Sequence, residues 1–313
     1  MIFARFRNYL HRHVQNYLRA VAEALPPPPT PYYRVEAPPK DKAEVVYDNH
    51  LLSGKTVLVT AAGQNIGRSI AIEMAKQGAT IYFTEIDTQR CDEVEKELQK
   101  LSPHSKGFYL DILKTDERHQ LLQYFDDQDL NIDVLVNNLG RNGATVKVED
   151  LEIEEWEETF KINLFGPVAL TKEIVSRMIE RKINGNVIFL TSINQQLASR
   201  WPSYSSAKAT LASIVKEFAI DLAPTGIRVN GIAPGHTDLD ESGLNIPSPE
   251  TPLYQTTIDP DYIGRAAVYL STEYFSRHTT GSILIVDGGR VLVNARSQEI
   301  TLREGLPLSP GIP

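Results

Sequence analysis

Hydrophobic residues in most of this chain form short runs that alternate with longer amphipathic segments. The short runs, such as residues 187–190 and 283–286, have the length of buried strands. Seven strands that alternate with helices predict an α/β fold, in which a doubly wound parallel sheet is covered by helices on both faces. The strands are predicted at 56–60, 81–84, 107–110, 133–136, 187–190, 228–232 and 283–286, and the helices at 68–77, 88–100, 115–125, 154–181, 204–222 and 260–271.

The first 25 residues follow a different pattern. Apolar residues recur at steps of three and four, and four arginines and one glutamate give the segment a charge of +3. It is predicted to be a basic amphipathic helix, followed by a proline-rich linker over 26–50. Such a helix could lie on an anionic membrane surface, pack on another subunit or on this protein, or act as a transit peptide. We expect a membrane-surface or docking role rather than an idle tail. The apolar stripe consists of Phe3, Phe6, Leu10, Val14, Tyr17 and Val21.

Composition narrows the classes of protein to consider. The chain has 40 acidic and 32 basic side chains, so its net charge of -8 disfavours nucleic-acid binding. Its single cysteine, Cys91, excludes an intrachain disulfide and fits a reducing, cytoplasmic compartment, with membrane association expected only through residues 1–25. No apolar run approaches the roughly 18 residues that span a bilayer. No histidine pair or cysteine cluster has metal-ligand spacing, so no metal site is expected.

A glycine-containing turn, residues 60–67, joins the first predicted strand to its helix. Glycine there allows close approach of a pyrophosphate, and the helix N-terminus supplies N–H donors and a partial positive charge. Glu85 ends the second strand 22 residues after Gly63, where an acid holds ribose hydroxyls in dinucleotide-binding folds. Since Glu85 would repel a 2′-phosphate and only Arg68 is near, NAD is expected rather than NADP. The alternative interpretations are that residues 60–67 form an ordinary strand-to-helix turn and that Glu85 is a solvated acid in a loop.

Two residues near position 200 suggest a group that exchanges a proton with a substrate. Tyr204 and Lys208 are four residues apart, so a helix places them on one face. The lysine ammonium should lower the tyrosine pKa, so that Tyr204 can exchange a proton with a substrate oxygen. Ser192 follows a predicted strand 12 residues earlier and can polarise that oxygen, whereas Thr191 should point to the opposite face. Asn163 lies inside the predicted helix 154–181, where it indicates either a polar task or a kink before Pro167.

Taken together and in this order, these segments resemble the short-chain dehydrogenase/reductase family, in its shorter-chain branch, over about residues 51–290. The family's turn reads Thr-Gly-x-x-x-Gly-x-Gly. Here Gly67 matches its last glycine, and Ala61 and Asn65 replace the first two. Residues 110–112 (Leu-Asp-Ile) resemble the adenine-contacting Asp-Val, residues 137–140 (Asn-Asn-Leu-Gly) resemble the Asn-Asn-Ala-Gly segment, and residues 234–235 (Pro-Gly) resemble the segment beside the nicotinamide.

The resemblance implies a Rossmann fold in a single catalytic domain. It also implies an NAD(H)-dependent oxidoreductase that interconverts a secondary alcohol and a ketone. In the implied catalytic set, Tyr204 is the acid/base, Lys208 tunes it, Ser192 orients the substrate oxygen, and Asn163 supports a proton relay through a water. The residues implied for cofactor binding are Thr60, Gly63, Asn65, Ile66, Gly67, Glu85, Asp111, Ile112, Asn138, Gly140, Tyr204, Lys208, Pro234, Gly235 and Thr237.

Other interpretations remain open. Because the glycine turn is altered, a catalytically idle NAD-binding scaffold or sensor is the main alternative. A sugar-nucleotide epimerase or dehydratase also uses Tyr-x-x-x-Lys, but the turn spacing fits the shorter branch better. A small alcohol or ketone is the expected substrate, closed in by the loop 193–203 and a lid at 236–259. A homodimer or homotetramer is expected, and residues 291–313 are expected to form a C-terminal tail.

Overall fold

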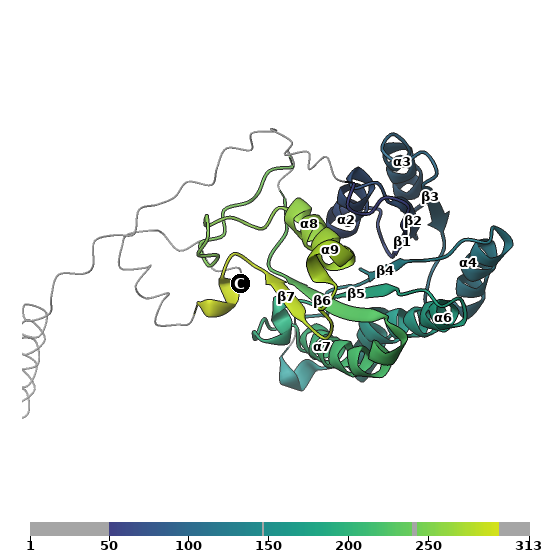
Figure 1. Cartoon of the computed structure of the whole chain (residues 1–313). Helices are drawn as coiled ribbons and strands as arrows, with labels where there is room; N and C mark the ends of the chain where they lie inside the picture. The colour runs from purple at the N-terminus through teal and green to yellow at the C-terminus, as the bar shows by residue number, and fades with distance from the viewer. Residues whose placement is uncertain (1–49, 146, 240–242, 294–313) are drawn as a thin grey trace, which may run out of the picture. The chain divides into compact units, whose positions relative to one another are not determined.

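The structure is a computed structural model that describes residues 50–145, 147–239 and 243–293 (Figure 1). The predicted N-terminal helix, almost all of the predicted linker and residues 294–313 of the predicted tail lie outside the described residues. Of the described helices, none is long and apolar enough to cross a membrane.

Seven parallel strands form one sheet in the order β3-β2-β1-β4-β5-β6-β7, which confirms the predicted doubly wound fold. The order reverses between β1 and β4, and ligands of such sheets bind beside this point at the carboxyl ends of the strands. The strands are β1 (Thr56–Val59), β2 (Thr80–Glu85), β3 (Lys106–Tyr109), β4 (Val134–Asn137), β5 (Asn186–Leu190), β6 (Arg228–Pro234) and β7 (Ile283–Val286).

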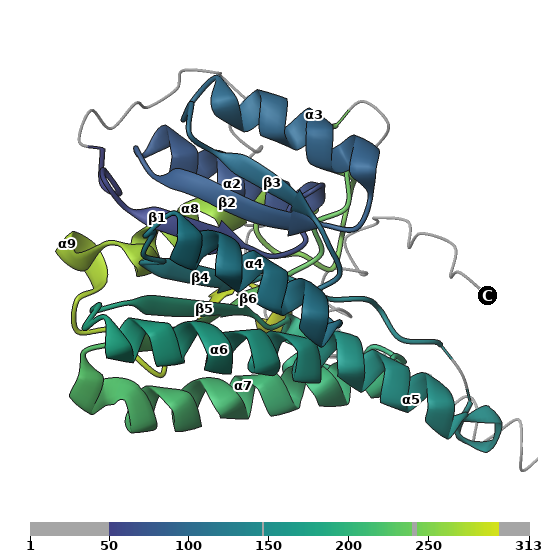
Figure 2. The ribbon, with the colours of Figure 1, turned by 90° about the vertical axis from the view of Figure 1, so that its right-hand side faces the viewer.

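Two apolar cores lie on the two faces of the sheet. Successive strand residues point to opposite faces, so Val57 and Val59 join one core while Leu58 joins the other. Figure 2 shows α4, α6 and α7 on one face, with α2 and α8 on the opposite side. A Cβ on Gly264 of α8 would lie 2.8 Å from the Ser69 carbonyl oxygen of α2, so only glycine allows this close packing. The helices are α2 (Asn65–Lys76), α3 (Thr88–Gln99), α4 (Thr115–Asp127), α5 (Ile153–Phe160), α6 (Gly166–Glu180), α7 (Pro202–Leu222), α8 (Pro260–Ser271) and α9 (Glu273–Ser276).

The helix predicted at 154–181 is divided by one wide turn. A π-helix over Lys161–Phe165 separates α5 from α6 and contains Asn163. Pro167 has no N–H, so it cannot donate to the main-chain carbonyl of Asn163 four residues earlier. The side-chain Nδ2 of Asn163 donates to the main-chain carbonyl oxygen of Thr159 at 3.0 Å. The helix is therefore distorted before Pro167, and the Asn163 side chain is buried and hydrogen-bonded.

Candidate active site

The predicted site residues gather at the carboxyl edge of the sheet. The glycine-containing turn follows β1, Asn138 and Gly140 follow β4, Ser192 follows β5, and Gly235 follows β6. These strands are neighbours and parallel, so their ends meet beside the switch point between β1 and β4. Segments up to 175 positions apart in the sequence thus form one edge.

The turn after β1 has the shape of a cradle. A Cβ on Gly63 would collide with Glu85 Oε2, and one on Gly67 would collide with Asn138 Nδ2. Ala61 and Asn65 have φ of +51° and +44°, which is the left-handed region that glycine adopts most easily. The turn therefore follows the path of a glycine turn at the two positions where the family's glycines are replaced.

Helix α2 begins at Asn65, three residues earlier than the predicted start at 68. Its N-cap residue Gln64 makes no side-chain capping bond, and its first turn has no acidic residue. By contrast, Asp87, Asp259 and Thr272 cap α3, α8 and α9. The first N–H groups of a helix have no partner within the helix, so an uncapped N-terminus suits a pyrophosphate.

Thr60 and Asn138 hold the ends of β1 and β4 together. Thr60 is fully buried, and its Oγ1 accepts the backbone N–H groups of Asn138 and Leu139 at 3.0 and 3.1 Å. Asn138 Nδ2 donates to the carbonyl oxygens of Thr60 and Ala61 at 3.1 and 3.0 Å. Both polar side chains thus set the shape of the cradle.

Glu85 is buried at the end of β2 and is bonded to the protein. Its Oε2 accepts the Gly63 N–H at 2.9 Å. Its Oε1 accepts the backbone N–H groups of Ile86 and Asp87 at 3.0 and 3.1 Å, and also Arg90 Nη2 at 3.0 Å. Three donors saturate Oε1, so Oε2 is the oxygen with room for a ribose hydroxyl.

Sequence reasoning missed Arg90, which lies in the first turn of α3. Besides the Glu85 contact, its Nη1 donates to Gln64 Oε1 in the turn after β1 at 3.1 Å. Arg68, the cation considered from the sequence, binds Glu97 at 2.6 Å instead. The signal was available, because Arg90 lies only five residues after Glu85 and early in a predicted helix.

Helix α7 carries the tyrosine and the lysine on one face. It begins at Pro202, so Tyr204 lies in its first turn and Lys208 one turn later. Lys208 Nζ lies 5.6 Å from the centroid of the Tyr204 ring and donates to the Leu190 carbonyl oxygen at 2.7 Å. Burial lowers the pKa of Lys208 to about 8.

The environment of Tyr204 differs from the one expected from sequence. Burial raises the pKa of Tyr204, and a hydrogen bond with Ser192 opposes the shift. The sequence predicts a lowered pKa from a lysine ammonium, but in the structure burial is the largest influence and the pKa of Tyr204 is raised. The Trp201 ring meets the Tyr204 ring edge-on, with 6.2 Å between the ring centroids, and helps to cover it.

Ser192 and Thr191 point in opposite directions, as alternation along a strand requires. Thr191 Oγ1 donates to the Ile232 carbonyl oxygen within the sheet at 3.1 Å. Ser192 Oγ accepts the Asn194 N–H at 3.2 Å and acts on the pKa of Tyr204. The structure therefore brings Ser192, rather than Thr191, to the tyrosine.

Asn163 and Gly140 lie beside the lysine. Asn163 Nδ2 donates to the carbonyl oxygens of Arg141 and Thr159 at 2.9 and 3.0 Å, and its Oδ1 accepts the Arg141 N–H at 3.1 Å. Its side chain therefore holds the loop after β4. A Cβ on Gly140 would lie 3.0 Å from Asn163 Oδ1 and 3.2 Å from Lys208 Nζ, so glycine keeps these groups close.

Glu155 of α5 is a second residue that sequence reasoning missed. Its Oε1 accepts the Thr159 hydroxyl at 2.8 Å, and the Ala144 N–H and the Ser203 hydroxyl at 3.1 Å each. Burial acts to raise the pKa of Glu155, but these hydrogen bonds outweigh it and the pKa is lowered. Glu155 thus joins the loop after β4 to the residue before Tyr204. It lies among several glutamates, so no signal in the sequence marked it.

The remaining predicted cofactor residues lie around the same edge. Asp111 Oδ1 accepts the Leu113 N–H at 2.9 Å, and the Ile112 side chain is buried in the core. Pro234 ends β6, and Gly235 donates its N–H to the Val286 carbonyl oxygen at 2.9 Å. Thr237, two residues after Gly235, is buried, and Ile66 is partly buried against the core. Within the described ranges, no group of three or more His, Cys, Asp or Glu residues is placed to hold a metal ion.

Comparisons with known proteins give concordant matches to one family. Residues 55–245 match the family described as short chain dehydrogenase. The chain is 32% identical over 251 residues to 7alpha-hydroxysteroid dehydrogenase of Escherichia coli K12, covering 78% of this chain and 97% of that protein. It is 29% identical to glucose 1-dehydrogenase 2 of Bacillus subtilis strain 168, covering 77% and 96%. The crystal structure of a short-chain type dehydrogenase/reductase from Mycobacterium marinum superimposes with a TM-score of 0.70 at 27% identity, covering 78% and 98%.

Proposed function

The chain belongs to the short-chain dehydrogenase/reductase family of NAD(P)-dependent oxidoreductases, and we propose that it interconverts a secondary alcohol and a ketone with NAD(H). One observation carries the proposal: the Ser192 hydroxyl interacts with the Tyr204 hydroxyl and acts to lower its pKa, and Lys208 Nζ lies 5.6 Å from the centroid of the tyrosine ring. A substrate oxygen placed at these hydroxyls meets one group that can exchange a proton and another that can hold it in position.

Each polar group of this cluster has a role in the proposed reaction. The nicotinamide, when bound, supplies or accepts the hydride. During reduction Tyr204 Oη gives its proton to the substrate oxygen, and during oxidation it takes that proton back. Ser192 Oγ donates a hydrogen bond to the same oxygen and polarises it. Lys208, whose pKa burial lowers to about 8, can exchange a proton near neutral pH and so restore the protonation state of the tyrosine.

Asn163 is proposed to act as a positioning residue. Its side chain is hydrogen-bonded to the main chain of Arg141 and Thr159, so it holds the loop after β4 beside Lys208. Its main-chain carbonyl lacks an N–H donor at the usual helical position because that residue is Pro167. This carbonyl is the part of Asn163 that we propose would hold the water of a proton relay from Lys208 to solvent.

The cradle after β1 fits a dinucleotide. Residues 63–67 and the uncapped N-terminus of α2 would hold the pyrophosphate, and Glu85 Oε2 would accept a ribose hydroxyl. We propose NAD rather than NADP, because Glu85 is buried beside the cradle and would repel the 2′-phosphate of NADP. Arg90 weakens this repulsion, since it binds the same carboxylate at 3.0 Å. Asn138, Gly140 and Pro234 to Thr237 would line the nicotinamide end.

The idle scaffold remains the competing function, and one assay separates the two. Purified protein with NADH is tested against a panel of ketones that includes oxosteroids, oxidised sugars and β-ketoesters, and absorbance at the nicotinamide band is followed. The panel is broad because the relatives include a hydroxysteroid dehydrogenase and a glucose dehydrogenase. Turnover that is lost in Tyr204→Phe supports the proposal. Tight NADH binding without turnover on any member supports the scaffold.

A further inference from the structure

A polar hollow lies at the amino edge of the sheet, opposite to the candidate active site. It holds about 790 Å³ of space, part of it open to solvent. The first residues of three neighbouring strands, Val134, Asn186 and Arg228, form its floor in register with one another. Its wall is formed by Ser271 at the end of α8, Glu273 at the start of α9, and residues 277–278 just after α9. None of these residues takes part in the proposed reaction.

Two residues that line this hollow each carry a buried polar atom with no hydrogen-bond partner among the described residues. Asn186 is 3% exposed, and its Nδ2 donates to the Leu270 carbonyl oxygen at 2.7 Å while its Oδ1 is unbonded. Ser271 is 7% exposed, and its Oγ is also unbonded. Buried polar atoms normally have partners. The Asn186 oxygen can only accept, so a ligand that satisfies it must carry a hydrogen-bond donor.

The charges around the hollow favour an anion. Arg228 binds only carbonyl oxygens within the described chain, those of Thr279 at 3.2 Å and Leu270 at 2.8 Å, which uses two of its five N–H groups. Lys55 and Asp133 pair with each other at 3.2 Å. The cations Arg228 and Arg277 then face a single carboxylate among the residues that line the hollow, Glu273.

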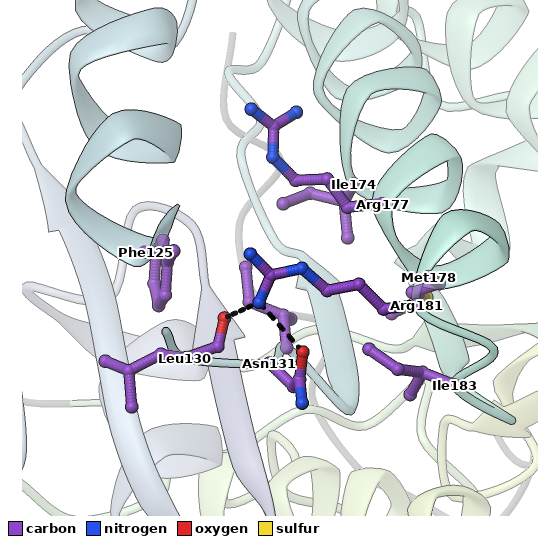
Figure 3. A pocket seen from close by; sticks show the side chains of 9 residues that line it. Phe125, Leu130, Asn131, Ile174, Arg177, Met178, Arg181 and Ile183 are labelled. Atoms are coloured by element: carbon purple, nitrogen blue, oxygen red, sulfur yellow. Dashed lines mark hydrogen bonds between the residues drawn. The ribbon is translucent and has the colours of Figure 1, made fainter. Parts of the chain in front are cut away.

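A second hollow shows the opposite arrangement. Figure 3 shows Arg177 and Arg181 beside a gap between α4 and α6, with Arg181 bonded to the Leu130 carbonyl oxygen and to Asn131. Both arginines also bind Asp126, at 3.0 and 3.1 Å, and Arg181 pairs with a second carboxylate, Asp129, at 3.5 Å. Their charge is therefore matched within the protein, and this gap offers no comparable site for an anion.

We propose that the amino-edge hollow binds inorganic phosphate, which retains a proton at neutral pH. Its anionic oxygens would accept hydrogen bonds from the free N–H groups of Arg228 and from Arg277. Its P–O–H would donate to Asn186 Oδ1, and Ser271 Oγ can donate or accept. Sulfate has the same shape but no proton at neutral pH, so it leaves the Asn186 oxygen unbonded. Selectivity for phosphate over sulfate is therefore the signature of this site.

Calorimetric titration of the full chain with inorganic phosphate and with sulfate, at constant ionic strength, tests the proposal. Phosphate should bind at least about tenfold more tightly than sulfate. Arg277→Gln should weaken phosphate binding about tenfold, whereas the matched control Arg181→Gln, in the hollow of Figure 3, should leave it unchanged. Asn186→Leu should remove the discrimination between the two anions. The Leu270 carbonyl keeps its bonds to Arg228 and Ser276 in that variant.

Several outcomes would overturn the site. Equal binding of phosphate and sulfate by the wild type would show that the protein does not recognise the P–O–H group of phosphate. Phosphate binding that is insensitive to Arg277→Gln would place the anion elsewhere, for example at the N-terminus of α2. If Asn186→Leu does not fold, Ser271→Ala replaces it and should lower the preference for phosphate. An inorganic phosphate series on NADH-saturated protein should give the same affinity, because the cofactor would occupy the other edge.

Discussion

The half of the candidate site that would move a proton differs in construction from the half that would hold the adenosine end of the cofactor. Ser192, Tyr204 and Lys208 come from the end of β5 and two successive turns of α7. The adenosine half depends on Glu85, whose carboxylate is shared by Gly63, by the backbone after β2 and by Arg90. The first half consists of a few hydroxyl and amino groups, and the second of a carboxylate inside a network.

This difference has a practical consequence for mutagenesis. A substitution in the proton-transfer half should change the chemistry with little effect on the fold, because few other groups depend on it. A substitution of Glu85 leaves four protein donors without their acceptor, so stability and cofactor preference would change together. Arg90 allows cofactor preference to be changed with less effect on stability, because it is partly exposed.

The largest effect is expected in the proton-transfer half. Tyr204→Phe removes the proton-exchanging hydroxyl and almost no volume, so turnover should fall by about a thousandfold. NADH affinity, measured by fluorescence titration, should change less than about twofold. Tyr274→Phe is the matched control, because Tyr274 is 84% exposed on α9. Turnover of Tyr204→Phe within a few-fold of wild type would contradict the assignment.

Lys208 should give the next largest effect and also a pH dependence. Lys208→Met should lower turnover by roughly a hundredfold. Burial lowers the pKa of Lys208 to about 8 in the folded state, while the unfolded value is near the ordinary 10.5. Between these values the unfolded chain binds more protons, so the free energy of unfolding rises with pH, by up to about 3 kcal/mol in total.

Denaturant titrations from pH 7 to pH 11 check the stability effect of Lys208. The difference in unfolding free energy between wild type and Lys208→Met should grow in favour of the wild type above about pH 8 and level off near the unfolded pKa. A difference that is constant with pH would show that Lys208 keeps its ordinary pKa in the folded protein.

Cofactor preference should change about tenfold through Arg90. Arg90→Ala removes a cation that partly neutralises Glu85, so the preference for NADH over NADPH should increase by roughly a factor of ten. Arg68→Ala is the control, since Arg68 is paired with Glu97. The ratio of kcat/KM for the two cofactors measures the effect. A shift toward NADPH would mean that Arg90 does not weaken the repulsion between Glu85 and the 2′-phosphate.

A smaller effect should come from the left-handed residues of the turn. Ala61→Gly removes a Cβ at φ +51° and should raise the free energy of unfolding by about 0.5–1 kcal/mol. Asn65→Gly should change it less, because asparagine tolerates this conformation. Ala209→Gly, on the exposed side of α7, should instead lower it by about 0.5–1 kcal/mol. Destabilisation by Ala61→Gly would contradict the interpretation of the turn as strained.

The smallest effect on turnover should come from deletion of residues 1–45. No residue proposed for the reaction precedes Thr60, so turnover should stay within about twofold of wild type. Co-sedimentation with anionic vesicles, or the oligomer size by light scattering, should decrease, since a basic amphipathic helix is predicted there. If neither decreases, the segment is an idle tail, and if turnover collapses, it belongs to the catalytic domain.

The sequence by itself determined the fold and the main polar residues of the site. Its alternation of short apolar runs and amphipathic segments is local, so it predicted seven strands in a parallel sheet. The four-residue spacing of Tyr204 and Lys208 was sufficient to put them on one helix face, and strand alternation was sufficient to choose Ser192 over Thr191.

Only the tertiary structure decided which of those residues are free and which are bonded. The burial that raises the pKa of Tyr204 and the arginine that shares Glu85 depend on neighbours brought by other elements. The role of Glu155 and the unbonded oxygen of Asn186 depend in the same way on the ends of strands and helices far apart in sequence. Hydrogen bonding and desolvation act over a few ångströms in space, whereas sequence patterns report the period of one element at a time.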